Sequence, residues 1–304
     1  MPDGAVLPYR EWRPVGTPSI VILALHGMND SRDAWEIPAP DFAAAGIAVY
    51  SPDLSGFGAT ANRGFWAGSA GLTREARVMA DLLRARYPHI RLILMAESMG
   101  AATAMVMATE PDPPAVDGYV LIAPAVWGRK EMGFFPRALL WLADHTLPGL
   151  TLTGRGFVNV TATDNRDALI RLSNDPLTIH ATRVDAVDGL VNLMDGALAA
   201  APKFHAPAFF LYGGRDELIP PNATAAMWRA LPPGSVRAYY ADDYHLMLRD
   251  KERNKPIGDI LAWIKDVHAP LPSGADQAAT EWLAKHDGTA GSVRPTQETP
   301  GISQ

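Results

Sequence analysis

Ser98 is the residue whose surroundings point most directly to chemistry. It lies in the run Ala-Glu-Ser-Met-Gly at 96–100, between an apolar stretch at 91–95 and a helix-forming stretch of small residues at 101–108. A serine at a strand-to-helix junction, with small residues two positions on either side, has the pattern of a nucleophile elbow. The helix N-terminus would stabilise an anion forming beside such a serine. The pattern predicts a nucleophile, although a serine that caps a helix would give the same string.

The loop after the apolar run 20–25 predicts groups that would stabilise a negatively charged oxygen. That loop reads His-Gly-Met-Asn-Asp at 26–30. In sites of this type, one backbone N–H comes from such a loop and another from the residue after the nucleophile. We therefore expect the N–H groups of Met28 and Met99 to form an oxyanion hole, each worth roughly 3 kcal/mol in the transition state. His26 precedes Ser98, the wrong order for the base, so we expect it to hydrogen-bond the loop and to contact the substrate.

Asp216 is the candidate acid, because the chain order required by this chemistry is serine, then Asp or Glu, then histidine. It follows the apolar run 208–212 and a Gly-Gly turn, which would bring its carboxylate to the same sheet edge as Ser98. An aspartate that caps the following helix is the alternative. Glu217 is the reserve acid.

His245 is the candidate base. Only His245, His268 and His286 follow Asp216 in the chain, and the last two lie at or beyond the end of the final long helix candidate. His245 would take the proton of Ser98, while Asp216 would fix the imidazole tautomer and stabilise its cation. This acyl-transfer chemistry requires no metal or organic cofactor. The neighbouring Asp242 and Asp243 are interpreted as residues that fix the loop.

The elements that must position these residues follow from the alternation of short apolar runs with helical patterns. Such alternation predicts an α/β fold with a mainly parallel sheet covered by helices. Strand candidates are 20–25, 47–51, 91–95, 119–123, 208–212 and 236–240, with an edge strand in 5–13; helix candidates are 34–45, 72–87, 99–109, 221–230 and 251–267. The first three central strands end in glycine-containing loops, at the sheet edge where α/β proteins place their sites.

The alternation stops between about 126 and 200, where no clear strand is predicted. We expect a hydrolase core at 5–125 and 201–268, a helical cap at 126–200, and a largely disordered tail at 269–304 with a short helix at 278–285. An amphipathic patch in the cap would contact an acyl chain through Phe134, Phe135 and Trp141. Packing of that patch against the core is the alternative.

Composition excludes several other classes of function. The 304 residues carry a formal net charge of -6 without a basic stripe, which argues against a nucleic-acid partner. Cysteine is absent, so disulfides and thiolate chemistry are excluded. No apolar run reaches the roughly 18 residues of a transmembrane segment. We expect a cytoplasmic protein if the chain is complete, or an exported or membrane-anchored one if an N-terminal segment was removed.

Five motifs together resemble the α/β-hydrolase superfamily, and within it the serine hydrolases similar to monoacylglycerol lipases and lysophospholipases. The matching segments are 26–30, Asp-Leu-Ser-Gly-Phe-Gly at 53–58, 97–100, Gly-Arg-Asp at 214–216 and Tyr-His at 244–245. The resemblance covers about 5 to 267 and implies a mainly parallel central sheet flanked by helices, with a helical cap inserted after the sixth core strand. This chain departs from the usual pattern at Ala96, where glycine is common, and at Ser55, where arginine is common.

The residues and the resemblance together predict hydrolysis of carboxylic esters through an acyl-enzyme on Ser98. The expected substrates are small acyl esters such as a monoacylglycerol or a lysophospholipid. An acyltransferase or a thioesterase would use the same triad, because the leaving group and the acceptor are selected by pocket shape. A catalytically silent ligand-binding scaffold is the alternative from another class. The sequence specifies no oligomeric state.

Overall fold

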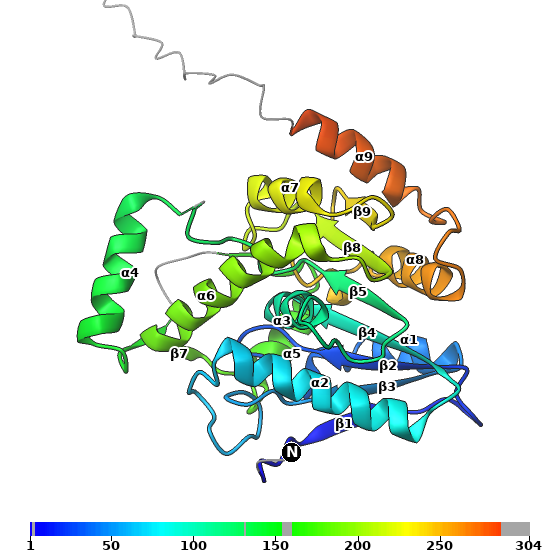
Figure 1. Cartoon of the computed structure of the whole chain (residues 1–304), viewed down its shortest axis with the longest axis horizontal. Helices are drawn as coiled ribbons and strands as arrows, with labels where there is room; N and C mark the ends of the chain where they lie inside the picture. Colours follow the sequence, from blue (N-terminus) through cyan, green and yellow to red (C-terminus); the bar gives the residue numbers. More distant parts are fainter. Residues whose placement is uncertain (2–3, 131, 154–159, 287–304) are drawn as a thin grey trace, which may run out of the picture.

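A seven-stranded sheet forms the centre of the molecule (Figure 1). The structure is a computed structural model that describes residues 1, 4–130, 132–153 and 160–286, apart from the side chains of residues 134–136. The strand order is β1-β3-β2-β4-β5-β8-β9, and β1 alone runs antiparallel to its neighbour in this sheet. The strands are β1 (Tyr9–Trp12), β2 (Ile20–Leu25), β3 (Ile47–Pro52), β4 (Arg91–Glu97), β5 (Gly118–Ile122), β8 (Ala208–Gly213) and β9 (Val236–Tyr240).

Helices cover both faces of the sheet, so the central strands are buried on both sides. Every residue of β2 and β3 is buried, which explains why these strands read as continuous apolar runs. Successive side chains point to opposite faces: Val21 belongs to one hydrophobic core and Ile22 to the other. The predicted mainly parallel sheet flanked by helices is confirmed.

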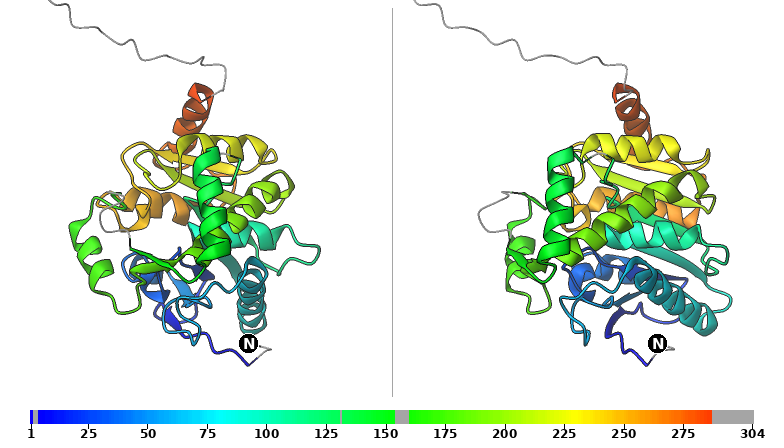
Figure 2. Two further views of the ribbon diagram at one scale, coloured as in Figure 1. Left: turned by 90° about the vertical axis from the view of Figure 1, so that its left-hand side faces the viewer. Right: turned by 60° about the vertical axis from the view of Figure 1, so that its left-hand side comes forward.

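The two helix layers draw on different parts of the chain (Figures 1 and 2). One core includes residues of α2 (Ser69–Arg86), α3 (Met99–Ala108), α6 (Val184–Ala200) and α7 (Pro221–Ala230). The other core includes residues of η1 (Arg32–Trp35), α1 (Ala39–Ala44) and α8 (Asn254–Lys265). Two further 3-10 turns are η2 (Ala201–Lys203) and η3 (Met247–Arg249).

The predicted helix at 34–45 is interrupted in the structure. The turn η1 ends at Trp35 and α1 begins at Ala39, with Pro38 before it and Pro40 in its first turn. Proline lacks an N–H and disfavours helical backbone at the preceding residue, so a helix cannot run through this segment unbroken. The other predicted helices are present, and the bounds of α7 are as predicted.

The segment between β5 and β8 contains α4 (Phe134–Thr146), β6 (Thr151–Thr153), α5 (Arg166–Asn174) and β7 (Ala181–Arg183), followed by α6. The prediction that this segment has no clear strand is wrong, because β6 and β7 pair as a small antiparallel sheet. Three residues are too few to show strand periodicity. Among the described residues, β1 to β5 precede this segment in the chain, whereas the resemblance implies a cap after the sixth core strand.

Helix α6 contacts α3 and contributes Leu193 and Ala197 to the core on that face of the sheet. Helix α6, the last part of the predicted cap at 126–200, therefore belongs to the helix layer on one face of the sheet. Helix α4 stands beside the beginning of α6, at the side of the molecule (Figure 1). None of the helices in the described residues combines the length and the apolar character needed to cross a bilayer.

Helix α9 (Ala275–Lys285) packs against β9, at the edge of the sheet. It begins before the predicted short helix at 278–285 and lies in the range expected to be largely disordered. Its Trp282 is 7% exposed, stacks on Tyr239 and meets Trp228 edge to face. The folded structure therefore extends past 268 because an aromatic residue of α9 completes the core.

Replacing Trp282 with alanine should lower the free energy of unfolding by about 3 kcal/mol, since a buried indole is removed. Urea denaturation followed by circular dichroism measures the change. The control is Trp141→Ala, whose indole is 59% exposed and whose loss should change stability by less than about 0.5 kcal/mol. Equal effects of the two substitutions would contradict the packing of α9.

Candidate active site

Ser98 occupies a strained turn between β4 and α3. Its φ of 54° and ψ of -115° are unusual for a residue with a side chain. The turn is held by the Ser98 N–H, which donates to the carbonyl oxygen of Ile122 at 2.9 Å. A Cβ atom at Gly100 would lie 2.7 Å from the carbonyl oxygens of Leu25 and His26, so glycine is required there. The methyl group of Ala96 is buried within the sheet, so alanine is accommodated on the other side of the turn.

Asp216 and His245 form a buried acid–base pair. Nδ1 of His245 lies 2.7 Å from Oδ2 of Asp216, and their side chains are 4% and 0% exposed. The other carboxylate oxygen accepts hydrogen bonds from the N–H groups of Leu218 and Ile219 at 2.8 and 2.9 Å. A carboxylate accepts and does not donate, so Nδ1 carries the proton and Nε2 is left to accept one.

The loop of the acid packs directly on the loop of the base. A Cβ atom at Gly213 would lie 2.4 Å from the carbonyl oxygen of Asp243, which excludes any side chain there. The N–H of Arg215 donates to that same carbonyl oxygen at 2.9 Å, and its guanidinium pairs with Asp242 at 2.6 Å. The Gly-Gly turn before Asp216 therefore allows the two loops to meet.

The environment of His245 raises its pKa. Burial opposes the charged imidazolium and by itself lowers the pKa. The charge and hydrogen bond of Asp216, with the charge of Glu97, outweigh burial, and the pKa lies above its ordinary value. Glu97, one of the charges that raise this pKa, immediately precedes Ser98 in the chain. The structure describes no hydrogen bond between the Ser98 hydroxyl and His245, and their contact stays a prediction.

The loop after β2 approaches the elbow closely. A Cβ atom at Gly27 would lie 3.3 Å from Cβ of Ser98. Met99 is fully buried at the start of α3, and Met28 is partly buried in the loop. Within the described part of the chain, neither the Met28 N–H nor the Met99 N–H has an acceptor. Both therefore remain candidates for the oxyanion hole.

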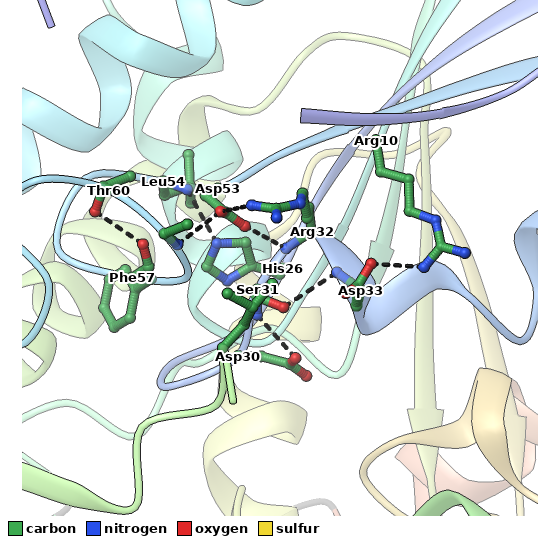
Figure 3. Close-up of polar contacts among 12 residues, drawn as sticks. Arg10, His26, Asp30, Ser31, Arg32, Asp33, Asp53, Leu54, Phe57 and Thr60 are labelled. Atoms are coloured by element: carbon green, nitrogen blue, oxygen red, sulfur yellow. Dashed lines mark hydrogen bonds and ion pairs between the residues drawn. The ribbon is translucent and has the colours of Figure 1, made fainter. Parts of the chain in front are cut away.

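His26 is enclosed by protein, which argues against the predicted contact with substrate. The side chain is fully buried, and Nε2 accepts from the Leu54 N–H at 3.0 Å (Figure 3). Nδ1 lies 2.8 Å from the Gly27 carbonyl oxygen. Burial lowers the pKa of this imidazole, which favours the neutral ring that these contacts need. His26 therefore joins the loops after β2 and β3. This agrees with the expectation that it hydrogen-bonds the loop.

An ion pair between Arg32 and Asp53 strengthens the same junction (Figure 3). Asp53 also accepts from the backbone N–H of Arg32 at 2.7 Å and of Ala59 at 2.8 Å. At Ser55, one of the departures from the family pattern, the N–H donates to Glu75 at 2.9 Å. The loop after β3 is therefore held without an arginine at position 55.

The structure separates the remaining candidates. Glu217 accepts from the N–H of Thr161 at 2.7 Å and so joins the acid loop to the segment between β5 and β8. Burial, aided by Asp250, raises the pKa of Asp243 to about 7. The side chains of Phe134 and Phe135 lie outside the described residues. Trp141 is exposed and stacks on His145.

Sequence reasoning misses Arg249. Its Nη2 donates to Asp30 of the β2 loop at 2.6 Å and to Glu97 at 3.0 Å, and all three side chains are buried. Burial raises the pKa of Glu97 although Arg249 opposes the shift. The only signal in the sequence is a glutamate at the end of an apolar strand, which a buried cation would have to balance. Among the described residues, no group of three or more His, Asp or Glu side chains could hold a metal ion.

Comparison with known families places this chain among serine hydrolases. The family described as "Serine aminopeptidase, S33" matches residues 16–252. A curated relative, the monoglyceride lipase of Mus musculus, is 26% identical over 279 residues, which cover 90% of each chain.

Solved structures share the fold. The crystal structure of a monoacylglycerol lipase from Paleococcus ferrophilus has a TM-score of 0.68 and 21% identity, covering 92% of this chain and 99% of the other. A soluble variant of monoglyceride lipase from Saccharomyces cerevisiae, in complex with a substrate analog, has a TM-score of 0.72 and 17% identity. That match covers 88% of this chain and 93% of the yeast chain.

Replacing Asp216 with asparagine should lower the pKa of His245, because the charge that outweighs burial is removed. Histidine-selective NMR titration of both proteins measures the shift. The control is Asp242→Asn in the loop after β9 that carries His245, where the carboxylate is 75% exposed and solvent screens its charge. A pKa that is the same in the wild type and Asp216→Asn would contradict the assignment of Asp216 as the charged partner.

Proposed function

The chain belongs to the α/β-hydrolase family described as "Serine aminopeptidase, S33", and from that premise we propose that it hydrolyses carboxylic esters through an acyl-enzyme on Ser98. One observation carries the proposal. The strained elbow of Ser98 and the buried pair of Asp216 and His245 follow the parallel strands β4, β8 and β9, at the same edge of the central sheet. A nucleophile, a base and an orienting acid at one edge are the parts needed for acyl transfer.

The hydrogen bond to Asp216 leaves Nε2 of His245 as the proton acceptor. As Nε2 removes the hydroxyl proton, the Ser98 oxygen bonds to the ester carbonyl carbon, and the carbonyl π electrons move to its oxygen. The N–H groups of Met28 and Met99 stabilise that oxyanion. The imidazolium then gives its proton to the leaving alcohol as the ester C–O bond breaks. Water repeats the sequence on the acyl-enzyme and releases the acid.

The proposed substrates are monoacylglycerols or similar small acyl esters. The names of the mouse and yeast relatives support a monoglyceride, and the length of the match supports a shared architecture. Helix α4 supplies exposed apolar side chains, at Leu139, Trp141 and Leu142, that are candidates to receive an acyl chain. An acyltransferase or a thioesterase would use the same three catalytic residues and differ in acceptor or leaving group.

Wild-type protein should hydrolyse p-nitrophenyl esters and monoacylglycerols of graded chain length, and Ser98→Ala should lower kcat by at least about 1,000-fold because the nucleophile is lost. The control is Ser19→Ala, which removes an exposed hydroxyl before β2, at the opposite edge of the sheet. A fluorophosphonate probe should label wild type and Ser19→Ala but not Ser98→Ala. Equal turnover by wild type and Ser98→Ala would contradict the proposal, as would hydrolysis of aminoacyl p-nitroanilides but no ester.

The pH dependence gives a separate test. Only neutral His245 can accept the serine proton. Because its pKa is raised, the imidazole stays protonated up to a higher pH than an ordinary histidine does. The value of kcat/KM should therefore increase with pH, with a midpoint above the ordinary pKa of histidine. Steady-state rates in buffers of constant ionic strength measure the curve. A midpoint below that ordinary value would contradict the role given to Asp216.

A further inference from the structure

Arg249 lies where three loops of the site meet. It follows His245 by four positions, Asp30 follows the oxyanion candidate Met28 by two, and Glu97 precedes Ser98. The side chain of Arg249 is 7% exposed, and those of Asp30 and Glu97 are 9% and 3% exposed. One guanidinium therefore contacts the oxyanion loop and the nucleophile elbow from the loop of the base.

Both contacts use the same nitrogen. Nη2 of Arg249 donates to Oδ2 of Asp30 and to Oε1 of Glu97, whereas Nε is buried without a partner in the described residues. The main-chain oxygen of Arg249 accepts from the side chain of Asn165 at 2.8 Å, which adds the segment between β5 and β8 to the junction. One nitrogen of Arg249 therefore joins the loop after β2 to the turn that carries Ser98.

We propose that Arg249 is a positioning residue for ester hydrolysis: through Nη2 it sets where the elbow of Ser98 and the oxyanion loop lie relative to His245. This inference rests on the proposed function. The transition state requires the hydroxyl, the imidazole and the oxyanion donors to be aligned together, and a displacement of about 1 Å can lower the rate about 100-fold. Ground-state binding of an ester depends less on that alignment. Loss of Arg249 should therefore lower kcat more than it changes KM.

Arg249→Gln should lower kcat by about 100-fold with KM changed less than about threefold, because the charge and its double contact are lost. Arg249→Lys should recover about tenfold of that loss, since a single ammonium nitrogen can donate to both carboxylates. Kinetics with p-nitrophenyl butyrate, beside the melting temperature of each variant, measure both effects. If Arg249→Gln does not fold, Arg249→Gln/Glu97→Gln removes one cation and one anion, preserves the net charge of the cluster, and should show the same loss of kcat.

Glu97→Gln separates charge from geometry. Its amide oxygen still accepts from Arg249, so kcat at the pH plateau should stay within about threefold of wild type. The charged groups that face His245 are Asp216, Glu97 and Arg249, and the substitution removes one anion among them. The acid limb of kcat/KM should therefore move to lower pH, a change that a purely structural role of the cluster would not cause. An unmoved acid limb would overturn the coupling of elbow and base.

The matched control is Arg84→Gln. Arg84 also joins separate segments through ion-pair and hydrogen-bond contacts, with Asp117 at 2.6 Å and with carbonyl oxygens of Ala115 and Ile90. It lies at the edge of the sheet where β4 and β5 begin, away from Ser98. Its loss should lower the melting temperature and leave kcat within about twofold of wild type.

Two results would overturn the inference while leaving the proposed function intact. One is wild-type kcat in folded Arg249→Gln, provided that Ser98→Ala is inactive. The other is an equal loss of kcat in Arg249→Gln, Arg249→Lys and Arg84→Gln, which would assign the effect to general destabilisation. Absence of ester turnover in the wild type would instead contradict the proposed function itself.

Discussion

The buried hydrogen bond between His245 and Asp216 is the interaction on which the rest of the site depends. A carboxylate with a side chain that is 0% exposed must be solvated by the protein, and the loop after β8 supplies this through the N–H groups of Leu218 and Ile219. Those donors leave one carboxylate oxygen for the imidazole, which fixes both the tautomer and the direction of the free nitrogen. The close approach at Gly213 and the raised pKa of His245 follow from the same requirement.

Other buried charges beside the site are compensated in the same way. The carboxylate of Asp53 pairs with Arg32 and accepts hydrogen bonds from two backbone N–H groups. Asp30 and Glu97 both pair with the guanidinium of Arg249. Buried ion pairs contribute little net stability, because desolvation of the charges offsets their attraction. Their consequence here is geometric. Each pair joins loops that follow different strands, and the loops after β2, β3, β4 and β9 are thereby connected from within the protein.

The sequence predicts the central strands well because both of their faces are buried, so each reads as one apolar run. Residue type and position in the chain are enough to select Ser98, Asp216 and His245 as candidates. In the structure, Asp216 and His245 are joined by a hydrogen bond. Strands β6 and β7 are too short to show periodicity, and α9 depends on Trp282 meeting aromatic residues of β9 and α7. Arg249 contacts residues 219 and 152 positions away, and no local pattern encodes such contacts. For His26, burial rather than residue type decides the role.

The segment between β5 and β8 is joined to the same loops from outside. The N–H of Thr161 donates to Glu217, next to Asp216, and the N–H of Leu246, next to His245, donates to the carbonyl oxygen of Ala162. Asn29, in the loop after β2, donates to Thr182 at 2.7 Å. A segment tied to the loops after β2, β8 and β9 cannot shift as a whole without straining the groups proposed to transfer the proton. Its sequence can therefore vary most freely between these attachment points, where α5 lies, and least at the attachment points themselves.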